Sequence, residues 1–372
     1  MTKTYKAQLV SLSFIFILLV LTRSTETAEA NEEIILTEIG SIPYARTCDV
    51  KVKDEILYVL QADYGLVTYD ISDPTTPSRL GRCTDTYTFV HALVIEDEYA
   101  YVADYEDGLE IVDISDPSDL TIIGDYTANL GAGSTDVYKL GDLAFLASQG
   151  IGLEIINCSD VNNPVKIGSY YENYRVIRVY SSNDQIFLCE ATNGFKILNI
   201  TGNECTEIFH FQDTVSYQEF FVLNNILYTT TRDGILIFDI HDLSNIKQLG
   251  GKDIGESFGA IIRQQNNRVI AYVSSWEAGV QILDVNDPEN IEIIGQYTDG
   301  GQAYNLDVRD NLIFVADFQD GIEIIQVEHL DLSSMNNNNY ESSTSTSTTG
   351  FTLFVVISVL IFSIVHKRRQ FN

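Results

Sequence analysis

The sequence predicts an all-β fold, a seven-bladed β-propeller with four-stranded antiparallel blades, and three observations support this prediction. A glycine followed by alternating apolar residues and an acidic turn recurs through the middle of the 372-residue chain. Each repeat holds four short stretches rich in β-branched and aromatic residues. The last repeat lacks its fourth stretch, and a stretch of similar sequence precedes the first repeat. Together these features predict a closed ring.

The spacing of the repeats matches the size of one propeller blade. Their marker glycines are separated by 43, 44, 42, 40, 45 and 42 residues. A solenoid of β-rich repeats is the alternative, but its coils are usually shorter and carry fewer strands. The repeat is clearest in segments 58–84, 101–127 and 272–298, and the marker glycines are Gly65, Gly108, Gly152, Gly194, Gly234, Gly279 and Gly321.

The ends of the repeat region predict how the ring closes. The seventh repeat ends after its third predicted strand, at 322–327. Residues 34–42 (IILTEIGSI) resemble the fourth strands of other repeats, for example 291–297 (IEIIGQY), although they precede the first repeat. Pairing this N-terminal strand with the last blade would leave no unpaired sheet edge at the seam. An open solenoid would have no use for such a permutation.

The third strand and the turn after it point to a known family. Residues 109–117 (LEIVDISDP) and their counterparts resemble the LVIVD repeat family of extracellular β-propellers, over about residues 34–327. This resemblance implies the propeller scaffold of many surface and secreted proteins and does not specify an activity. Repeats four and five lack the Asp-Pro turn, at 199–202 and 239–243, so their loops on that face are expected to differ.

The N-terminal residues 1–30 are predicted to be a signal peptide. Lys3 and Lys6 precede an apolar run at 9–21, and Ala28-Glu29-Ala30 forms a small-x-small cleavage site. A retained signal anchor is the alternative, but this apolar run is short for a membrane span. The propeller domain is then expected to occupy residues 31–331.

The C-terminal residues are predicted to anchor the propeller outside the cell. Residues 332–350 are rich in Ser, Thr and Asn and form a stalk. Residues 351–365 are apolar and form a transmembrane or sorting segment, and the basic tail at 366–372 marks the cytoplasmic side. This order resembles the tripartite sorting signals of archaeal and bacterial surface proteins, in which the segment is either retained or processed. Both cases place the propeller outside the cell, and the predicted location is the cell surface with a single-pass membrane anchor.

The charge of the chain excludes nucleic acid as a partner. Lysine and arginine total 22 against 53 aspartates and glutamates, and the net charge is −31. An acidic surface repels phosphate backbones, and it also keeps an exposed domain soluble. The expected partner is an extracellular protein or glycan, bound by a monomeric propeller.

The mouth of the central channel is the main candidate site. The first strand of each propeller blade lines the channel, and aligning these strands predicts a mixed polar ring with more acids than bases. Such a ring could bind a cation or a small polar ligand. A water-filled channel with satisfied polar groups is the alternative. The ring residues are Asp49, His91 or its neighbour Ala92, Asp136, Arg178, Glu219 and Asn305.

Calcium is the one cofactor that the sequence suggests, and the suggestion is weak. Asp104, Glu106 and Asp107 form the densest acidic turn and are the candidate ligands. The repeated Asp-Pro pairs, such as Asp73-Pro74, are interpreted as structural turns because Asp accepts backbone N–H groups and Pro fixes φ.

The remaining candidates concern export. Asn157 and Asn199 begin glycosylation sequons. The five cysteines are an odd number, and Cys158 and Cys205 are the one suggested disulfide, since both lie near third-to-fourth-strand loops of adjacent repeats.

Two classes of function remain open. The first is a binding, adhesion or display module, in which a rigid ring presents its loops. The second is an extracellular hydrolase or lyase with its site at the channel mouth. The even repeat spacing leaves no room for large insertions over one face, so the sequence favours the binding module over an enzyme.

Overall fold

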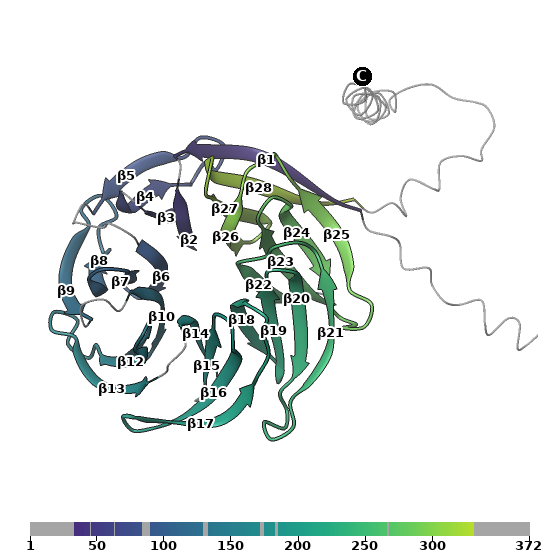
Figure 1. The fold of residues 1–372 in the computed structure, drawn as a ribbon. Coiled ribbons are helices and arrows are strands. Elements are labelled where there is room, and N and C mark those ends of the chain that lie inside the picture. The colour runs from purple at the N-terminus through teal and green to yellow at the C-terminus, as the bar shows by residue number, and fades with distance from the viewer. Residues whose placement is uncertain are drawn as a thin grey trace, which may run out of the picture. The chain divides into compact units, whose positions relative to one another are not determined.

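The computed structural model describes residues 33–330 apart from 45, 63, 84–89, 129–132, 172–174, 183–184 and 266–267. These residues form one compact unit of seven four-stranded antiparallel sheets, arranged as blades around a central axis (Figure 1). The predicted all-β seven-bladed propeller is therefore confirmed. No helix in this part of the chain is long and apolar enough to cross a membrane. The predicted signal peptide, stalk, anchoring segment and basic tail lie outside the described residues.

Six blades consist of four consecutive strands, and the seventh takes its outer strand from the N-terminal end of the ring. Blade 1 is β2 (Thr47–Lys53), β3 (Ile56–Gln61), β4 (Gly65–Asp70) and β5 (Ser78–Arg82). Blade 2 is β6 (Val90–Glu96), β7 (Tyr99–Asp104), β8 (Gly108–Asp113) and β9 (Thr121–Thr127). Blade 3 is β10 (Ser134–Leu140), β11 (Leu143–Ser148), β12 (Gly152–Asn157) and β13 (Val165–Tyr171).

The other blades follow the same plan. Blade 4 is β14 (Val176–Ser182), β15 (Gln185–Glu190), β16 (Gly194–Thr201) and β17 (Glu204–Phe211). Blade 5 is β18 (Tyr217–Leu223), β19 (Ile226–Thr231), β20 (Gly234–Asp239) and β21 (Lys247–Asp253). Blade 6 is β22 (Ala260–Gln265), β23 (Arg268–Ser275), β24 (Gly279–Asp284) and β25 (Glu292–Tyr297). Blade 7 is β26 (Ala303–Arg309), β27 (Leu312–Asp317), β28 (Gly321–Leu330) and β1 (Glu33–Pro43).

The ring closes through the pairing of β1 with β28. The two strands run antiparallel, with a register from Glu33 opposite Leu330 to Pro43 opposite Gly321. Figure 1 shows the N-terminal strand, in purple, lying along the C-terminal one. The prediction that residues 34–42 complete the last blade is confirmed. Since β28 is paired on both sides, the seam has no unpaired edge there.

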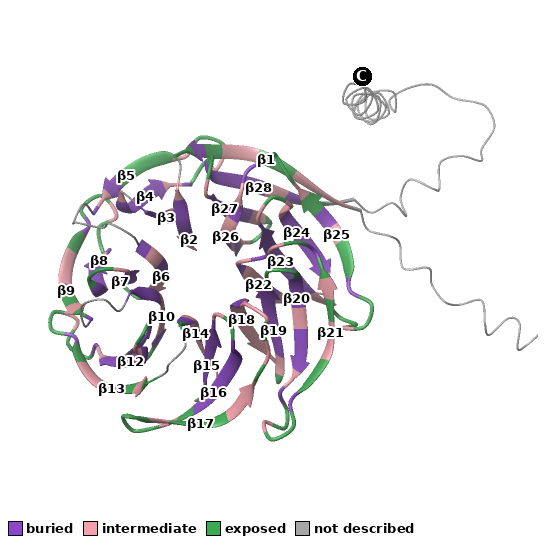
Figure 2. Ribbon diagram, viewed as in Figure 1, coloured by how far each residue is buried: buried purple, intermediate pink, exposed green. Residues whose placement is uncertain are grey.

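The middle strands of each blade are buried on both faces because each blade packs between two neighbours. In blade 2, residues 100–104 of β7 and 108–112 of β8 are all buried, whereas β9 alternates between exposed and buried positions. One apolar cluster joins Leu60 of blade 1 to Val102 of blade 2. Figure 2 shows this gradient from buried middle strands to exposed outer strands. Each fully buried aliphatic side chain of this kind contributes about 1.5–3 kcal/mol.

Two kinds of glycine explain the repeat signal. Gly108, which begins a third strand, has φ of 104°, and a Cβ there would lie 2.3 Å from the Tyr126 carbonyl oxygen. Gly40, in an outer strand, has no room for a Cβ because the Pro74 carbonyl oxygen of the next blade would be 2.1 Å away. Glycine therefore permits both the tight start of the third strand and the close approach of neighbouring blades.

The Asp-Pro pairs are turns, as the sequence predicted. The Oδ1 atom of Asp73 accepts the Thr75 N–H at 3.0 Å, and Asp116 does the same for Ser118 at 2.9 Å. Hydrogen bonds from Thr75 hold the pKa of Asp73 below its ordinary value. The turn also supplies the carbonyl against which Gly40 packs, so it serves contact between blades.

Closure of the ring by β1 can be tested with Ile42→Ala. Ile42 is 7% exposed and packs between blades 1 and 7. Truncation of a buried isoleucine is expected to lower the free energy of unfolding by about 2–5 kcal/mol, measured by urea denaturation. Ser41→Ala, at the exposed neighbouring position, is the control and should change stability little. An equal, small effect of both substitutions would contradict the closing role of β1.

Candidate functional site: the central channel and its mouth

The first strands of the blades line the channel, and a bulge sets which side chain faces it. A β-bulge precedes the ring position in six of the seven first strands. A bulge changes the direction of the side chain that follows it. This explains why most of the polar side chains of the ring occupy the same position in each first strand. The residues directly after the bulges are Asp49, Ala92, Asp136, Arg178, Glu219 and Asn305.

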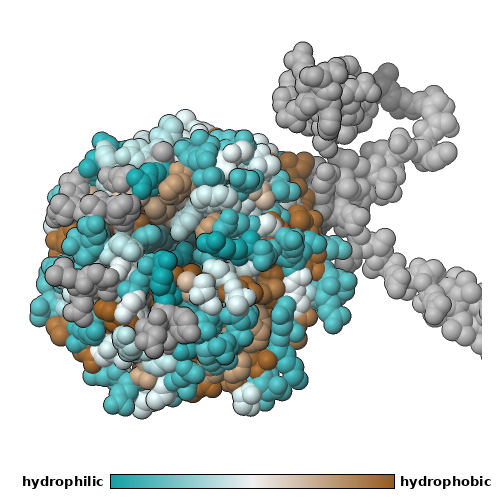
Figure 3. Space-filling view, viewed as in Figure 1, coloured by the Kyte–Doolittle hydropathy of each residue, from teal (hydrophilic) through white to brown (hydrophobic). Residues whose placement is uncertain are grey.

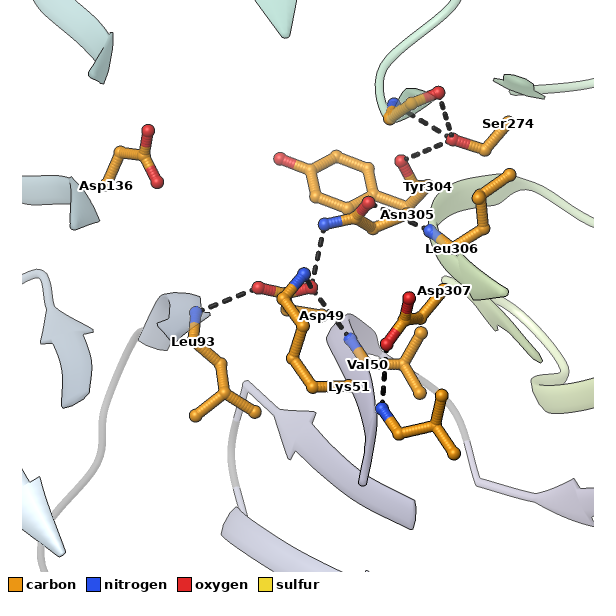
Figure 4. A network of polar contacts seen from close by, with 12 residues as sticks. Asp49, Val50, Lys51, Leu93, Asp136, Ser274, Tyr304, Asn305, Leu306 and Asp307 are labelled. Carbon is orange, nitrogen blue, oxygen red and sulfur yellow. Dashed lines mark hydrogen bonds and ion pairs between the residues drawn. The ribbon is translucent and has the colours of Figure 1, made fainter. Parts of the chain in front are cut away.

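The structure thus brings the predicted ring residues together around one cavity. Ala92 holds the ring position in blade 2, and its neighbour His91 lines the wider mouth as well as the channel. The channel interior is a cavity of about 260 Å³ whose lining includes Lys51. Figure 4 shows Asp49 surrounded by hydrogen-bond partners, with Asp136 on another side of the channel.

Several channel carboxylates connect the innermost strands of neighbouring blades. Asp49 accepts the Val50 N–H through Oδ1 and the Leu93 N–H of blade 2 through Oδ2, both at 2.8 Å. Its Oδ1 also accepts the Asn305 side-chain amide at 2.7 Å. The innermost strand is a sheet edge with unpaired N–H groups, so these contacts satisfy donors that would otherwise lack partners.

The same arrangement occurs twice more around the ring. Asp136 accepts the Val137 N–H at 3.0 Å and the Val179 N–H of blade 4 at 2.8 Å. Asp307 accepts the N–H of the residue after it and, across the seam, the Val52 N–H of blade 1, both at 2.8 Å. Asp307 lies on β26 two residues after the ring residue Asn305. These aspartates therefore fasten blade to blade, and their polarity alone does not indicate a ligand.

Burial and neighbouring charges shift the pKa values of several channel groups. Burial raises the pKa of Asp136, although Arg178 opposes the shift. Burial and the nearby Asp136 raise the pKa of Glu219. For Lys51, burial lowers the pKa, but Asp49 and other carboxylates outweigh it and the net pKa is raised. Among the described residues, Glu219 accepts one long hydrogen bond, from the Phe220 N–H at 3.3 Å. Its carboxylate therefore has fewer hydrogen-bond partners than those of the aspartates.

One mouth of the channel widens into a funnel of about 720 Å³. Its wall includes the three arginines Arg175, Arg178 and Arg232. Arg175 lies directly before β14, and Arg232 lies in the β19–β20 turn. His91 also lines this cavity. Burial together with Arg178 lowers the pKa of His91 to about 4, so its imidazole is neutral at neutral pH. We call this cavity the funnel below.

An aromatic cluster forms part of the funnel wall. Phe258 and Tyr304 line it, with ring centroids 4.9 Å apart. Trp276, the only tryptophan of the chain, packs 5.3 Å from Phe258 and 6.2 Å from Phe318. All four side chains are half-buried. Trp276 also has a φ of 28°, a left-handed backbone that is rare for a bulky residue and that concentrates at functional sites.

Repeat alignment identified His91 and Arg178 of the funnel and missed its other residues, several of which break the repeat. The position after the second strand is Tyr105, Gln149, Ala191, Arg232, Trp276 and Phe318 in blades 2 to 7. A residue that differs from blade to blade at a turn is the signal that could have pointed to this face.

The candidate calcium ligands lie partly together. Asp104 is fully buried, and one oxygen each from Asp104, Asp107 and Glu110 lie within 4.8 Å of one another. Glu106 is outside this group and donates its backbone N–H to Asp104 Oδ1 at 2.8 Å. Asp104 also accepts the Asp107 N–H at 3.1 Å, so it builds the turn whether or not a cation binds.

A second acidic group, not predicted, occupies the matching place in blade 7. It consists of Asp299, Asp317 and Glu323, with oxygens again within 4.8 Å. Burial, and then the hydrogen bond with Asp299, raise the pKa of Glu323 to about 9. The same hydrogen bond lowers the pKa of Asp299. The pair therefore holds one shared proton at neutral pH.

The suggested disulfide is not formed. Cys158 and Cys205 are both free thiols. Cys158 lies in the apolar cluster between blades 2 and 3, whereas Cys205 packs against the one between blades 3 and 4. Asn157 ends β12 and accepts the Ser159 N–H at 2.9 Å, and Asn199 is exposed on β16, so both sequons lie at strand positions.

The fastening role of the channel carboxylates predicts a loss of stability in Asp49→Ala. The substitution leaves the buried Val50 and Leu93 N–H groups without their acceptor, which is expected to cost about 1–3 kcal/mol. Asp49→Asn keeps one carbonyl acceptor and should cost less. Urea denaturation of both variants measures the difference. Unchanged stability of Asp49→Ala would show that water replaces the carboxylate.

Glu323 predicts a pH-dependent stability. Its folded pKa, about 9, lies above the ordinary 4.5, so the folded state binds the proton more tightly. The free energy of unfolding is expected to fall as the pH rises between these values, by at most about 1.4 kcal/mol per pH unit. Glu323→Gln should flatten this slope, and Glu328→Gln, at an exposed position of the same strand, should not. Equal slopes in wild type and Glu323→Gln would refute the shared proton.

Comparison with known proteins agrees with this fold. Two solved structures are similar to this chain over most of its length. The first is the computationally designed Ika8 protein, with a TM-score of 0.60 and 11% identity over 78% of this chain and 99% of its own. The second is the β-propeller domain of Myceliophteria thermophila Cps50 (Swd1), with a TM-score of 0.60 and 11% identity over 79% of this chain and 100% of its own. No curated protein matches the chain significantly in sequence.

A family model for the LVIVD repeat matches residues 45–85, 90–128, 270–299 and 300–338. These segments overlap blades 1, 2, 6 and 7, and blades 1, 2 and 6 carry the repeat in its clearest form. Blades 3 to 5 lie outside the matched segments, in accordance with the departures seen in repeats four and five. The chain is a seven-bladed β-propeller that carries LVIVD repeats.

Proposed function

We propose that the protein is a binding, adhesion or display module of the cell surface, whose propeller holds an extracellular protein or glycan at the funnel. The observation that carries this proposal is the funnel itself, a concavity of about 720 Å³ at one end of the channel. Its volume is within the range of about 300–1,000 Å³ that ligand pockets occupy. Turn residues from several blades meet there on a rigid scaffold, which is the usual arrangement of a binding site.

The chemistry of the face supports recognition of a ligand. Aromatic side chains are enriched at interfaces, so the half-buried Phe258 and Tyr304 of the funnel suit contact with a ligand. Much of the face viewed in Figure 3 is hydrophilic, in keeping with the net charge of −31. Nucleic acid is an unsuitable partner for such a surface.

The predicted terminal segments supply the surface location in this proposal. Cleavage of residues 1–30 would export the chain, and residues 351–365 would hold it in the membrane below a flexible stalk. Retention of the protein inside intact cells, out of reach of added protease, would argue against the location.

An extracellular hydrolase or lyase is the second candidate, favoured by one observation. Glu219 and Asp136 have raised pKa values in one channel, as acid–base groups often do. Against catalysis, both oxygens of Asp136 already accept backbone N–H groups. Glu219→Gln separates the candidates, because it should abolish turnover by an enzyme and leave ligand capture by a binding module intact.

The binding proposal predicts that Arg232→Glu abolishes ligand capture. Arg232 lines the funnel with a side chain that is 67% exposed, so the substitution alters the site and spares the core. Capture of extracellular proteins and glycans by the full chain, measured by pull-down and glycan array, should fall at least about tenfold. The matched control is Arg79→Glu, an exposed arginine on outer strand β5, which should bind as wild type. Equal capture by both variants would place the ligand elsewhere.

A further inference from the structure

The funnel has a charge opposite in sign to that of the protein as a whole. The chain carries a net charge of −31, yet the funnel lining includes three arginines and one carboxylate, Asp233. An acidic surface generally repels anions, so a local cluster of guanidinium groups defines the place where an anionic group would be attracted.

The guanidinium groups of the funnel arginines retain N–H donors that a ligand could use. Arg175 is exposed and forms no ion pair within the described residues. Arg178 donates to the Ile177 carbonyl at 3.0 Å and to the Tyr304 hydroxyl, and the charges of Asp136 and Glu219 act on it from the channel side. Arg232 lies 3.6 Å from Glu256, at the rim. A guanidinium fork matches a planar carboxylate in two parallel hydrogen bonds, so these groups suit a carboxylate ligand.

The aromatic part of the wall indicates that the ligand also has a ring. Phe258 and Tyr304 line the funnel with half-buried rings, Trp276 packs against Phe258, and Phe318 packs against Tyr304. A flat apolar face of a ring packs well against such a platform. The strained backbone of Trp276 is maintained by hydrogen bonds of its carbonyl with the N–H groups of Ala303, at 3.1 Å, and Gly279, at 3.2 Å.

Hydroxyl and amide groups complete the lining. They can donate to and accept from several ligand hydroxyls, which a simple aromatic acid would not offer. A sugar ring matches this combination better than a purely apolar ring does. These residues are Thr135, Gln149, Thr192, Ser216 and Gln218.

We propose that the funnel binds an acidic sugar, a pyranose bearing a carboxylate, with the carboxylate on the arginines and one ring face on Phe258 and Tyr304. This proposal rests on the proposed binding function and specifies the chemical class of its ligand. Arg175 and Arg232 recognise the charge at the rim, and Arg178 recognises it at the entrance of the channel.

The test uses the fluorescence of Trp276 as a reporter, since it is the only tryptophan and packs against Phe258. The purified full chain, kept in mild detergent, is titrated with a glucuronic-acid oligosaccharide, a glucose oligosaccharide of equal length, and inorganic sulfate. The acidic sugar should give a saturable change, with affinity at least about tenfold higher than for the neutral sugar. Sulfate should give only a weak response, because it has no ring to stack.

Variants assign the two parts of the ligand to the two parts of the wall. Arg175→Gln and Arg232→Gln should each weaken binding of the acidic sugar about tenfold, and Arg79→Gln should not. Urea denaturation checks that all three remain folded. An equal response to neutral and acidic sugars, or no saturable response to either, would overturn the proposal. Capture of a neutral glycan or a protein that is still lost in Arg232→Glu would overturn this ligand class and leave the binding function standing.

Discussion

The pairing of β1 with β28 is the contact on which the rest of the molecule depends. Without it, β28 would present a row of unpaired N–H and C=O groups, and blade 7 would lack the outer strand that the other six blades have. The pairing also positions Ile42 and Ile34 in the apolar clusters on either side of blade 7. Closure therefore combines a hydrogen-bonded ladder with burial of apolar surface, and the channel and the funnel exist only because the ring is complete.

Closure of the ring leaves backbone N–H groups along the channel that need hydrogen-bond acceptors. Seven innermost strands turn one edge each toward the axis, and their N–H groups need acceptors. Asp49, Asp136 and Asp307 meet this need by accepting from two blades at once. Lys51 offsets part of the negative charge by its contact with Asp49 at 3.1 Å. The acidic channel is therefore primarily a structural feature. Ligand recognition is expected at residues that do not accept backbone hydrogen bonds between blades.

The sequence was sufficient for the parts of the structure that repeat. Marker glycines, strand stretches and the displaced strand at 34–42 follow from backbone geometry that every blade shares, so the ring and five of its channel residues could be predicted. The sequence left His91 and Ala92 as alternatives because the bulge in β6, which sets the ring position at Ala92, cannot be located without strand pairing; both residues line the channel.

The funnel and the acidic groups depend on contacts between repeats that alignment cannot supply. Arg175, Phe258 and Tyr304 are far apart in the chain and meet only because their blades converge at one mouth. Glu110 joins Asp104 through strand pairing across a hairpin, where sequence proximity had suggested Glu106. Cys158 follows the third strand of blade 3 and Cys205 lies in the fourth strand of blade 4, and each side chain enters a different apolar cluster.

The register that sets Glu33 opposite Leu330 also governs how the ring responds to mechanical load. Because both ends of the ring belong to one antiparallel pair, a force that draws them apart acts first on that outermost rung. The ladder would then unzip rung by rung toward Pro43 and Gly321, at low force per step, while the remaining blades stay folded. A molecule stretched through its ends should therefore open at this seam before any other blade yields.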